Sequence, residues 1–325
     1  MHHESVPDHT IKVRRMILTS IATAVVSPFA LGQSPETNRD DAEEKEVLEI
    51  ARKAKLRPFQ TRETPRFRVF GDAPESFLAL TLRDCESIAT DFCRYYEGHA
   101  FPIKPSVDRL SVVALKDDKA FAAFLGIPPN TNLDGLYSKT TNRLVVYDFR
   151  PSGPQAPLRP GYANLRTLAH ETTHQLCFNT GLLQREGDVP LALVEGMAML
   201  GEVRKFNAAS LPGGVNALRL ENIATLRRRN VPWIPLKTLI RDDELLRGSQ
   251  GGLVLLLGYA QAWLLVYALM TNPRRREGFK SYLQAIGPRR KSESRLEDAK
   301  AHWGDLDEFD NELNALAVTL LKSNF

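Results

Sequence analysis

The stretch His170-Glu171-Thr172-Thr173-His174 decides how this chain is interpreted, because it places three chemically active side chains within one short segment. On an α-helix, residues four apart differ by about 40° around the axis, so His170 and His174 point the same way from successive turns. Two neutral imidazoles in that arrangement can bind one zinc ion. The carboxylate of Glu171, about 100° further round the helix, can take a proton from a metal-bound water. The stretch therefore predicts a helix that carries most of a metal site.

A third ligand is needed, because the same short pattern also arises by chance in unrelated proteins. A third histidine in the HExxHxxGxxH pattern is excluded, since Cys177 and Thr180 stand where its glycine and its histidine would be. Further along, residues 193–198 read Leu-Val-Glu-Gly-Met-Ala, and twenty residues separate His174 from Glu195. Residues 180–190 contain glycines, an aspartate and a proline that can turn the chain back, so a second helix can lie antiparallel to the first.

This arrangement resembles the gluzincins, zinc peptidases whose third ligand is a Glu on a second helix, commonly in an apolar-x-Glu-Gly-x-Ala setting. The resemblance implies that Glu195 joins His170 and His174 as a zinc ligand. The alternative is that Glu195 is an ordinary carboxylate near a helix start, where the helix dipole favours negative charge. The small residues Gly196 and Ala198 are expected to let the second helix approach the first closely.

The longer stretch His-Glu-x-x-His-Gln-Leu-Cys-Phe-Asn-Thr-Gly-Leu, residues 170–182, resembles a bacterial peptidase-MA-like family whose members are largely uncharacterised. The likeness is strongest over residues 162–203 and extends from about residue 65 to about residue 320. It implies an α+β fold of the gluzincin or thermolysin type. In that fold, a small mixed sheet with a hairpin edge strand packs on the zinc-binding helix pair, and a mainly helical part follows.

Glu202 is a candidate partner of a zinc ligand. It lies seven residues after Glu195, about two helical turns, so the two carboxylates share a helix face. Some aminopeptidase-type gluzincins carry a Glu at this offset, which implies that Glu202 orients His170 or His174. The alternative is a solvent-exposed carboxylate.

Tyr259 is the second candidate catalytic residue, beside Glu171. Gluzincins often supply a Tyr or His from a later helix to stabilise the oxyanion. Residues 258–263, Gly-Tyr-Ala-Gln-Ala-Trp, resemble the tyrosine-bearing helix of peptidase-MA-like proteins. Tyr267 is an alternative, and a buried structural tyrosine is as good an interpretation, because aromatic residues at helical spacing usually belong to a core.

Hydrophobic periodicity upstream of the metal motif indicates alternating strands and helices. It predicts strands over residues 66–70 and 110–115, helices over 74–96 and 119–125, and a hairpin over 133–147. After the proline-rich residues 151–160 the pattern becomes mostly helical. We therefore expect a strand-rich part over residues 65–160 and a helical, zinc-binding catalytic part over residues 161–325. An extended peptide could add to the hairpin edge as a further strand, and a closed structural hairpin is the alternative.

Residues 251–270 are twenty residues without a charge, which is long enough to cross a membrane. Glycines, Tyr259 and Gln261 interrupt the run, however, and a helix buried in a globular core is also apolar on all sides. We expect a core helix, and hence no stable membrane span in the mature chain.

The N-terminus reads as an export signal followed by a linker. Lys12, Arg14 and Arg15 precede an apolar run over residues 16–30 and a small-residue stretch, the order of a secretory signal over residues 1–32. Arg14-Arg15 also weakly suggests twin-arginine export, and an uncleaved anchor is the alternative. Residues 33–64 are rich in charge and are expected to be a linker with one loose helix. We expect export to the periplasm or the cell exterior after cleavage.

Composition narrows the classes of partner. The chain has 325 residues, 43% of them hydrophobic, and a formal net charge of +4, so it can bury a large core and lacks the strong basic excess of a nucleic-acid binder. Its three cysteines predict no disulfide framework. The expected function is zinc-dependent hydrolysis of a peptide or protein substrate, with Zn²⁺ held by two His and one Glu. The alternatives are a non-catalytic zinc-containing binding or scaffold protein and, less well supported, a membrane-embedded protease. Oligomeric state stays open.

Overall fold

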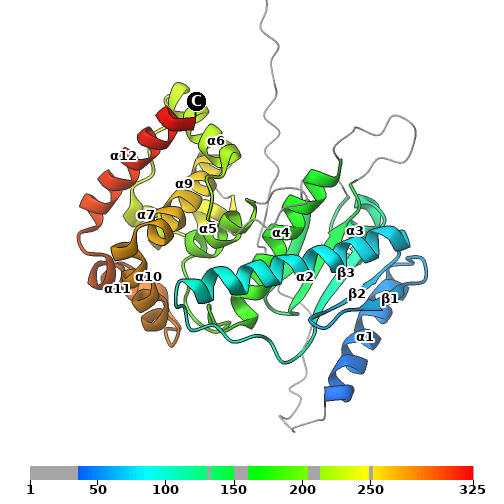
Figure 1. The fold of residues 1–325 in the computed structure, drawn as a ribbon. Coiled ribbons are helices and arrows are strands. Elements are labelled where there is room, and N and C mark those ends of the chain that lie inside the picture. Colours follow the sequence, from blue (N-terminus) through cyan, green and yellow to red (C-terminus); the bar gives the residue numbers. More distant parts are fainter. Residues whose placement is uncertain (1–35, 130–132, 150–159, 204–212, 249–251, 325) are drawn as a thin grey trace, which may run out of the picture.

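The chain forms an α+β structure, a sheet-containing N-terminal part followed by a mainly helical C-terminal part (Figure 1). The computed structural model describes residues 36–129, 133–149, 160–203, 213–248 and 252–324. The export signal expected over residues 1–32 lies outside the described residues.

The sheet contains five strands in the order β1-β2-β3-β5-β4. Strand β2 pairs parallel with β3 and β3 pairs parallel with β5, whereas β1 and β4 are antiparallel edge strands. The bounds are β1 Gln60–Glu63, β2 Phe67–Gly71, β3 Leu110–Leu115, β4 Gly135–Ser138 and β5 Arg143–Tyr147. Strands β4 and β5 form the predicted hairpin, and β4 is the free edge on that side.

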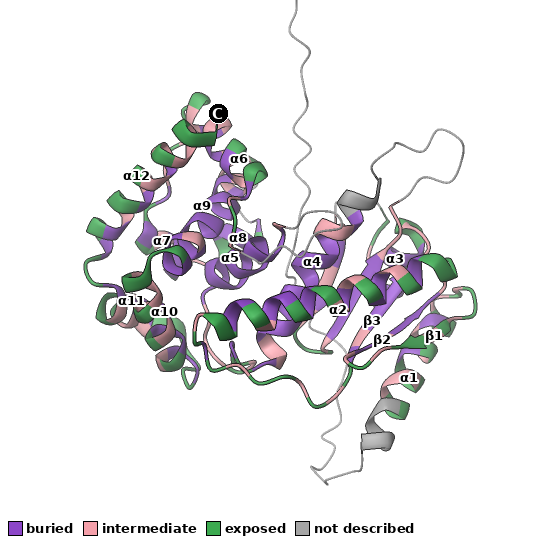
Figure 2. Cartoon of the chain, in the orientation of Figure 1, coloured by how far each residue is buried: buried purple, intermediate pink, exposed green. Residues whose placement is uncertain are grey.

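Helices cover both faces of this sheet, so its central strands are buried on both sides (Figure 2). In β3, Val112 and Ala114 belong to the main core, whereas Val113 and Leu115 belong to a second, smaller core. Helices α2 (Glu75–Gly98) and α4 (Pro160–Asn179) pack on the main-core face. Helices α1 (Glu36–Lys53) and α3 (Asp118–Leu125) pack on the other face. This burial explains why the strands read as nearly continuous apolar runs.

The charged segment over residues 33–64 differs from the expected linker. Helix α1 places Val47 in the second core, and its Glu43 accepts hydrogen bonds from Arg143, a residue of β5 that is only 4% exposed. Strand β1 then pairs with β2 over its whole length. The high charge of α1 predicts a loose helix. The sequence does not reveal that some of these charges pair with an arginine that is buried in the fold.

The C-terminal part is built around helix α9 (Gly252–Thr271), which packs against α5, α6, α8, α10 and α12. The remaining helices are α5 Leu191–Gly201, α6 Ala217–Arg228, α7 Leu236–Arg241, α8 Glu244–Arg247, α10 Pro273–Ile286, α11 Arg295–Trp303 and α12 Leu306–Asn324, with a short 3₁₀ turn over Ser292–Ser294. Within the described ranges, α9 is the one helix long and apolar enough to cross a membrane, and 78% of its most apolar window is buried inside the protein. It is a helix of the protein core here.

Glycines allow two close helix contacts around α5, and one of them differs from the expectation. A Cβ at Gly196 would lie 2.3 Å from the carbonyl oxygen of Ala262, so this glycine allows the close approach of α9 and not, as expected, of α4. The close approach to α4 occurs instead at Gly201, where a Cβ would lie 2.2 Å from Oγ1 of Thr173. Residue size alone predicts a close contact but not which neighbour makes it.

A buried arginine ties the start of α5 to the C-terminal helices. Arg295, whose side chain is 6% exposed, donates to both carboxylate oxygens of Asp188 and of Asp243. Asp243 also accepts a hydrogen bond from the backbone N–H of Leu191, the first residue of α5. Through this cluster, the helix that carries Glu195 is anchored at its N-terminal end.

We expect Arg295→Ala to lower the free energy of unfolding by about 3–5 kcal/mol, because the carboxylates of Asp188 and Asp243, which are 13% and 18% exposed, lose this buried charged partner. Urea unfolding monitored by circular dichroism measures this change. The matched control is Arg289→Ala, which breaks an ion pair with Asp298 made by a side chain that is 48% exposed; a loss below about 1 kcal/mol is expected there. Equal losses in the two variants would contradict the anchoring role of Arg295.

Candidate metal centre

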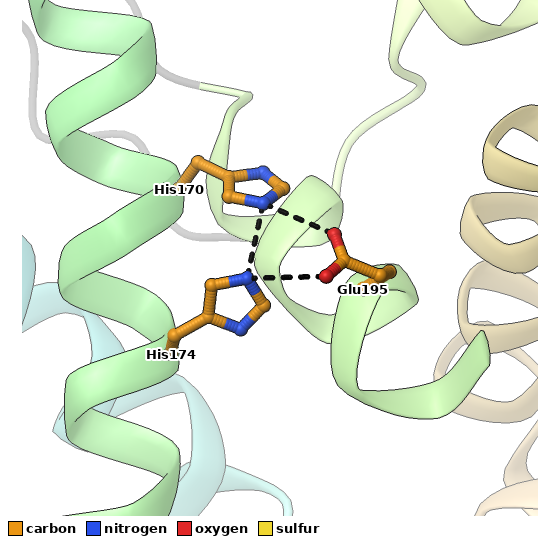
Figure 3. A group of neighbouring side chains, drawn as sticks. All are labelled: His170, His174 and Glu195. Carbon is orange, nitrogen blue, oxygen red and sulfur yellow. Dashed lines mark hydrogen bonds and ion pairs between the residues drawn. The ribbon is translucent and has the colours of Figure 1, made fainter. Parts of the chain in front are cut away.

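Helices α4 and α5 lie side by side and bring three side chains to one point (Figure 3). His170 and His174 project from successive turns of α4, and Glu195 faces them from α5. The three are 1–2% exposed. The distances are 3.1 Å between the two Nε2 atoms, 3.3 Å from Nε2 of His170 to Oε2 of Glu195, and 3.7 Å from Nε2 of His174 to Oε1 of Glu195.

These distances fit a tetrahedral metal ion. Zinc bound to nitrogen or oxygen at about 2.0–2.1 Å separates its ligand atoms by about 3.3 Å. Oε2 of Glu195 is buried and accepts no hydrogen bond, which leaves a carboxylate oxygen free for a cation. Two imidazole nitrogens and a carboxylate also match the donor preference of zinc. In the described part of the chain, this is the one group of three His, Cys, Asp or Glu side chains whose ligand atoms converge in this way.

The ring of His170 is oriented by Glu202, the residue that caps the C-terminus of α5. Nδ1 of His170 lies 2.9 Å from Oε1 of Glu202. A carboxylate can only accept a hydrogen bond, so Nδ1 carries the proton and the lone pair of Nε2 points at the metal position. The predicted contact between Glu202 and one of the two motif histidines is therefore present.

A proton competes with the metal at this site. Burial lowers the pKa of His170, but the carboxylates of Glu195 and Glu202 outweigh burial and raise this pKa to about 9. Burial lowers the pKa of His174 to about 4, which keeps its imidazole neutral. Burial alone would raise the pKa of Glu195, yet the positive charge of the neighbouring His170 lowers it. Without a cation at this site, the two carboxylates therefore favour the protonated form of His170, and a metal ion bound there would replace that proton.

Glu171 lies beside the metal position without joining the ligand group. Its Oε2 accepts a hydrogen bond of 2.7 Å from the backbone N–H of Tyr137 in edge strand β4. Gly135, two residues earlier, makes room for this contact, since a Cβ there would lie 3.1 Å from Cγ of Glu171. Burial raises the pKa of Glu171 to about 7, a value suited to a group that accepts and returns a proton near neutral pH.

Amide side chains join the hairpin to α4, and sequence reasoning missed them. Nε2 of Gln175 donates to the backbone oxygens of Ser111 and Asn142, and the amides of Asn142 and Asn179 bond to each other. Asn142 has a φ of +59° in the hairpin turn, a conformation that Asn tolerates better than most residues. Gln175 and Asn179, the polar residues that follow the HETTH motif, were the sequence feature that could have predicted these contacts. These amide side chains hold the β4–β5 hairpin beside α4.

Tyr259 lies on α9 and is 6% exposed. Burial raises its pKa well above the ordinary value, and the negative charge of Glu195 adds to this shift. The hydroxyl lies 3.5 Å from the backbone oxygen of Leu246. Tyr267, the alternative, packs its ring on Trp263 and is only partly buried. An oxyanion-stabilising role for Tyr259 stays a prediction.

The remaining histidines and cysteines of the folded region do not join this centre. His99 bonds through Nδ1 to the backbone oxygen of Tyr95, and His302 packs on the ring of Tyr282. The three cysteines are free thiols, as predicted.

Fold and site together define an α+β protein with a buried His-His-Glu group compatible with an HExxH…E zinc site. Comparison with known proteins adds one family match. The sequence model of a family described as "Protein of unknown function (DUF1570)" matches residues 164–292, the segment that contains the whole candidate centre. No curated protein matches the chain.

Proposed function

We propose that this protein is a zinc-dependent peptide hydrolase. The observation that carries the proposal is the position of Glu171, a buried carboxylate held beside three converging metal ligands but separate from them. Structural zinc sites have four protein ligands, whereas catalytic sites have three and keep a position for water or substrate. The three-ligand group of the described residues supports the catalytic type.

A bound zinc ion would supply a Lewis acid and a water of lowered pKa. His170, His174 and Glu195 would hold that ion. Glu171 takes the proton of the attacking water and passes it to the leaving amine, while the Tyr137 N–H keeps its carboxylate in place. We assign Tyr259 to the developing oxyanion, for which its burial and the packing of its helix α9 on α5, the helix that carries Glu195, are the support.

We further propose that the substrate is an extended peptide or protein segment that adds to β4 as a strand. Strand β4 is an edge of the sheet, and it lies on the side of α4 that carries Glu171. Backbone hydrogen bonds to such an edge supply affinity without requiring a particular side-chain sequence. Export before action is part of the same proposal, on the basis of the basic and apolar N-terminal residues.

Metal content and peptide cleavage, measured on one preparation, test this function. We expect near-stoichiometric zinc by elemental mass spectrometry and cleavage of a mixed peptide library. A chelator should remove both, and added zinc should restore both. Zinc without cleavage of any peptide would instead support the non-catalytic binding protein. A protein that neither contains nor takes up zinc would refute the metal site itself.

A further inference from the structure

We propose that Arg219, with Asn216, is a positioning residue of the metal centre: the first turn of α6 holds Glu202 against His170. The inference rests on the proposed metal site and adds to it helix α6, which carries none of the three candidate ligands. Asn216 is the N-cap of α6, and Arg219 lies in the first turn of that helix. The HETTH motif and Glu195 give no hint of either residue, because both lie beyond α5 in the sequence.

Glu202 is held by three donors, each of which is buried or nearly so. Its Oε1 lies 2.9 Å from Nδ1 of His170 and accepts from Nη2 of Arg219 at 2.7 Å. Its Oε2 accepts from Nδ2 of Asn216 at 2.9 Å. The side chains of Glu202 and Arg219 are 3% and 11% exposed. Little water reaches this carboxylate, so the protein donors decide where it sits.

Asn216 also links the carboxylate of Glu202 to the backbones of α5 and α6. Its Nδ2 also donates to the carbonyl oxygen of Met199 in α5, and its Oδ1 accepts from the backbone N–H of Arg219. One side chain thus caps α6, ties it to α5 and holds Glu202. The start of α6 is thereby fixed relative to the helix that carries Glu195.

The charge of Arg219 also balances the centre. Glu171, Glu195 and Glu202 are three carboxylates in a buried cluster, and the guanidinium of Arg219 faces one of them. With all three carboxylates ionised and both histidines neutral, these groups leave two negative charges, which a divalent cation would neutralise. Without Arg219, the cluster keeps one excess negative charge, and Glu202 loses one of the three donors that hold it against His170.

The test compares zinc affinity in Arg219→Met, Arg219→Lys and the wild-type protein by competition with a chromogenic chelator. Methionine keeps the side-chain bulk but donates nothing, and we expect it to weaken zinc binding by about 10–100-fold, the effect of losing an outer-shell partner. Lysine keeps one charged donor and should restore most of the affinity. The visible spectrum of the Co²⁺-loaded protein should shift in Arg219→Met and return toward wild type in Arg219→Lys.

Arg228→Met is the matched control, because Arg228 is on the same helix, is exposed and contacts Thr225. We expect its zinc affinity and cobalt spectrum to equal those of the wild type. Wild-type zinc affinity in Arg219→Met would overturn the inference and leave the proposed function intact. Equal losses in the methionine and lysine variants, with an unchanged cobalt spectrum, would also overturn it. If Arg219→Met does not fold, Arg219→Gln, which removes the positive charge but keeps a neutral donor, replaces it in the same two measurements with the same expected loss. No zinc binding by the wild type would refute the proposed function instead.

Discussion

Glu195→Ala is expected to abolish metal binding at working zinc concentrations. The variant leaves two histidines from one helix and removes the only carboxylate of the described ligand group. Loss of a ligand should cost more than the about 10–100-fold that follows loss of an outer-shell partner. Zinc at about 1,000 times its dissociation constant stabilises a folded protein by about 4 kcal/mol. The wild type should therefore melt at a higher temperature with zinc than without it, and the variant should show no difference.

Elemental analysis and thermal melting with and without zinc measure this effect. Glu221→Ala is a suitable control, since Glu221 is an exposed glutamate of α6. It should keep both the zinc content and the zinc-dependent rise in melting temperature. Full zinc occupancy in Glu195→Ala would remove Glu195 from the ligand set and, with it, the gluzincin interpretation.

Glu171→Gln is expected to lower the rate of peptide hydrolysis by about 10²–10⁴-fold, the usual contribution of a positioned acid–base group. Glutamine matches glutamate in size, and its amide oxygen can still accept the hydrogen bond from the Tyr137 N–H. The edge strand and the metal ligands should therefore stay in place. Cleavage rate and zinc content, measured on the same sample, separate loss of the base from loss of the site.

Glu186→Gln is the control for this experiment, because Glu186 is exposed in the connection between α4 and α5. It should cleave at the wild-type rate. Undiminished cleavage by Glu171→Gln would show that another group activates the water. Simultaneous loss of zinc would make Glu171 a ligand, against the geometry in which it lies beside the ligand group.

Much of the fold follows from local sequence patterns. The strand predicted over residues 110–115 coincides with β3, and the predicted hairpin is formed by β4 and β5. The spacing of His170 and His174 predicts their shared helix face, and Glu202 lies where its offset from Glu195 places it. Each of these is a regularity within one element or between two neighbouring ones, which side-chain periodicity can reveal.

The parts that could not be predicted are contacts between distant polar residues. Arg219 meets Glu202 because α5 and α6 both pack on α9, and no spacing in the sequence relates the two. The sequence of α1 and β1 resembles a linker, because the contact of α1 with Arg143, about 100 residues further along the chain, and the pairing of β1 with β2 form only in the folded protein. Such contacts depend on tertiary packing, which cannot be predicted from the patterns of a single sequence.

The division of the ligands between two helices has a consequence for how the protein assembles. Helix α4 packs on the sheet, whereas α5 packs on α9 in the helical part, so the ligand group exists only while these two layers are docked. If zinc binds as proposed, its binding free energy would depend on this docking, and the zinc affinity would report how stably the two layers pack together. A substitution far from the ligands that weakens the docking of the two layers should first lower the metal occupancy, before it causes any loss of secondary structure.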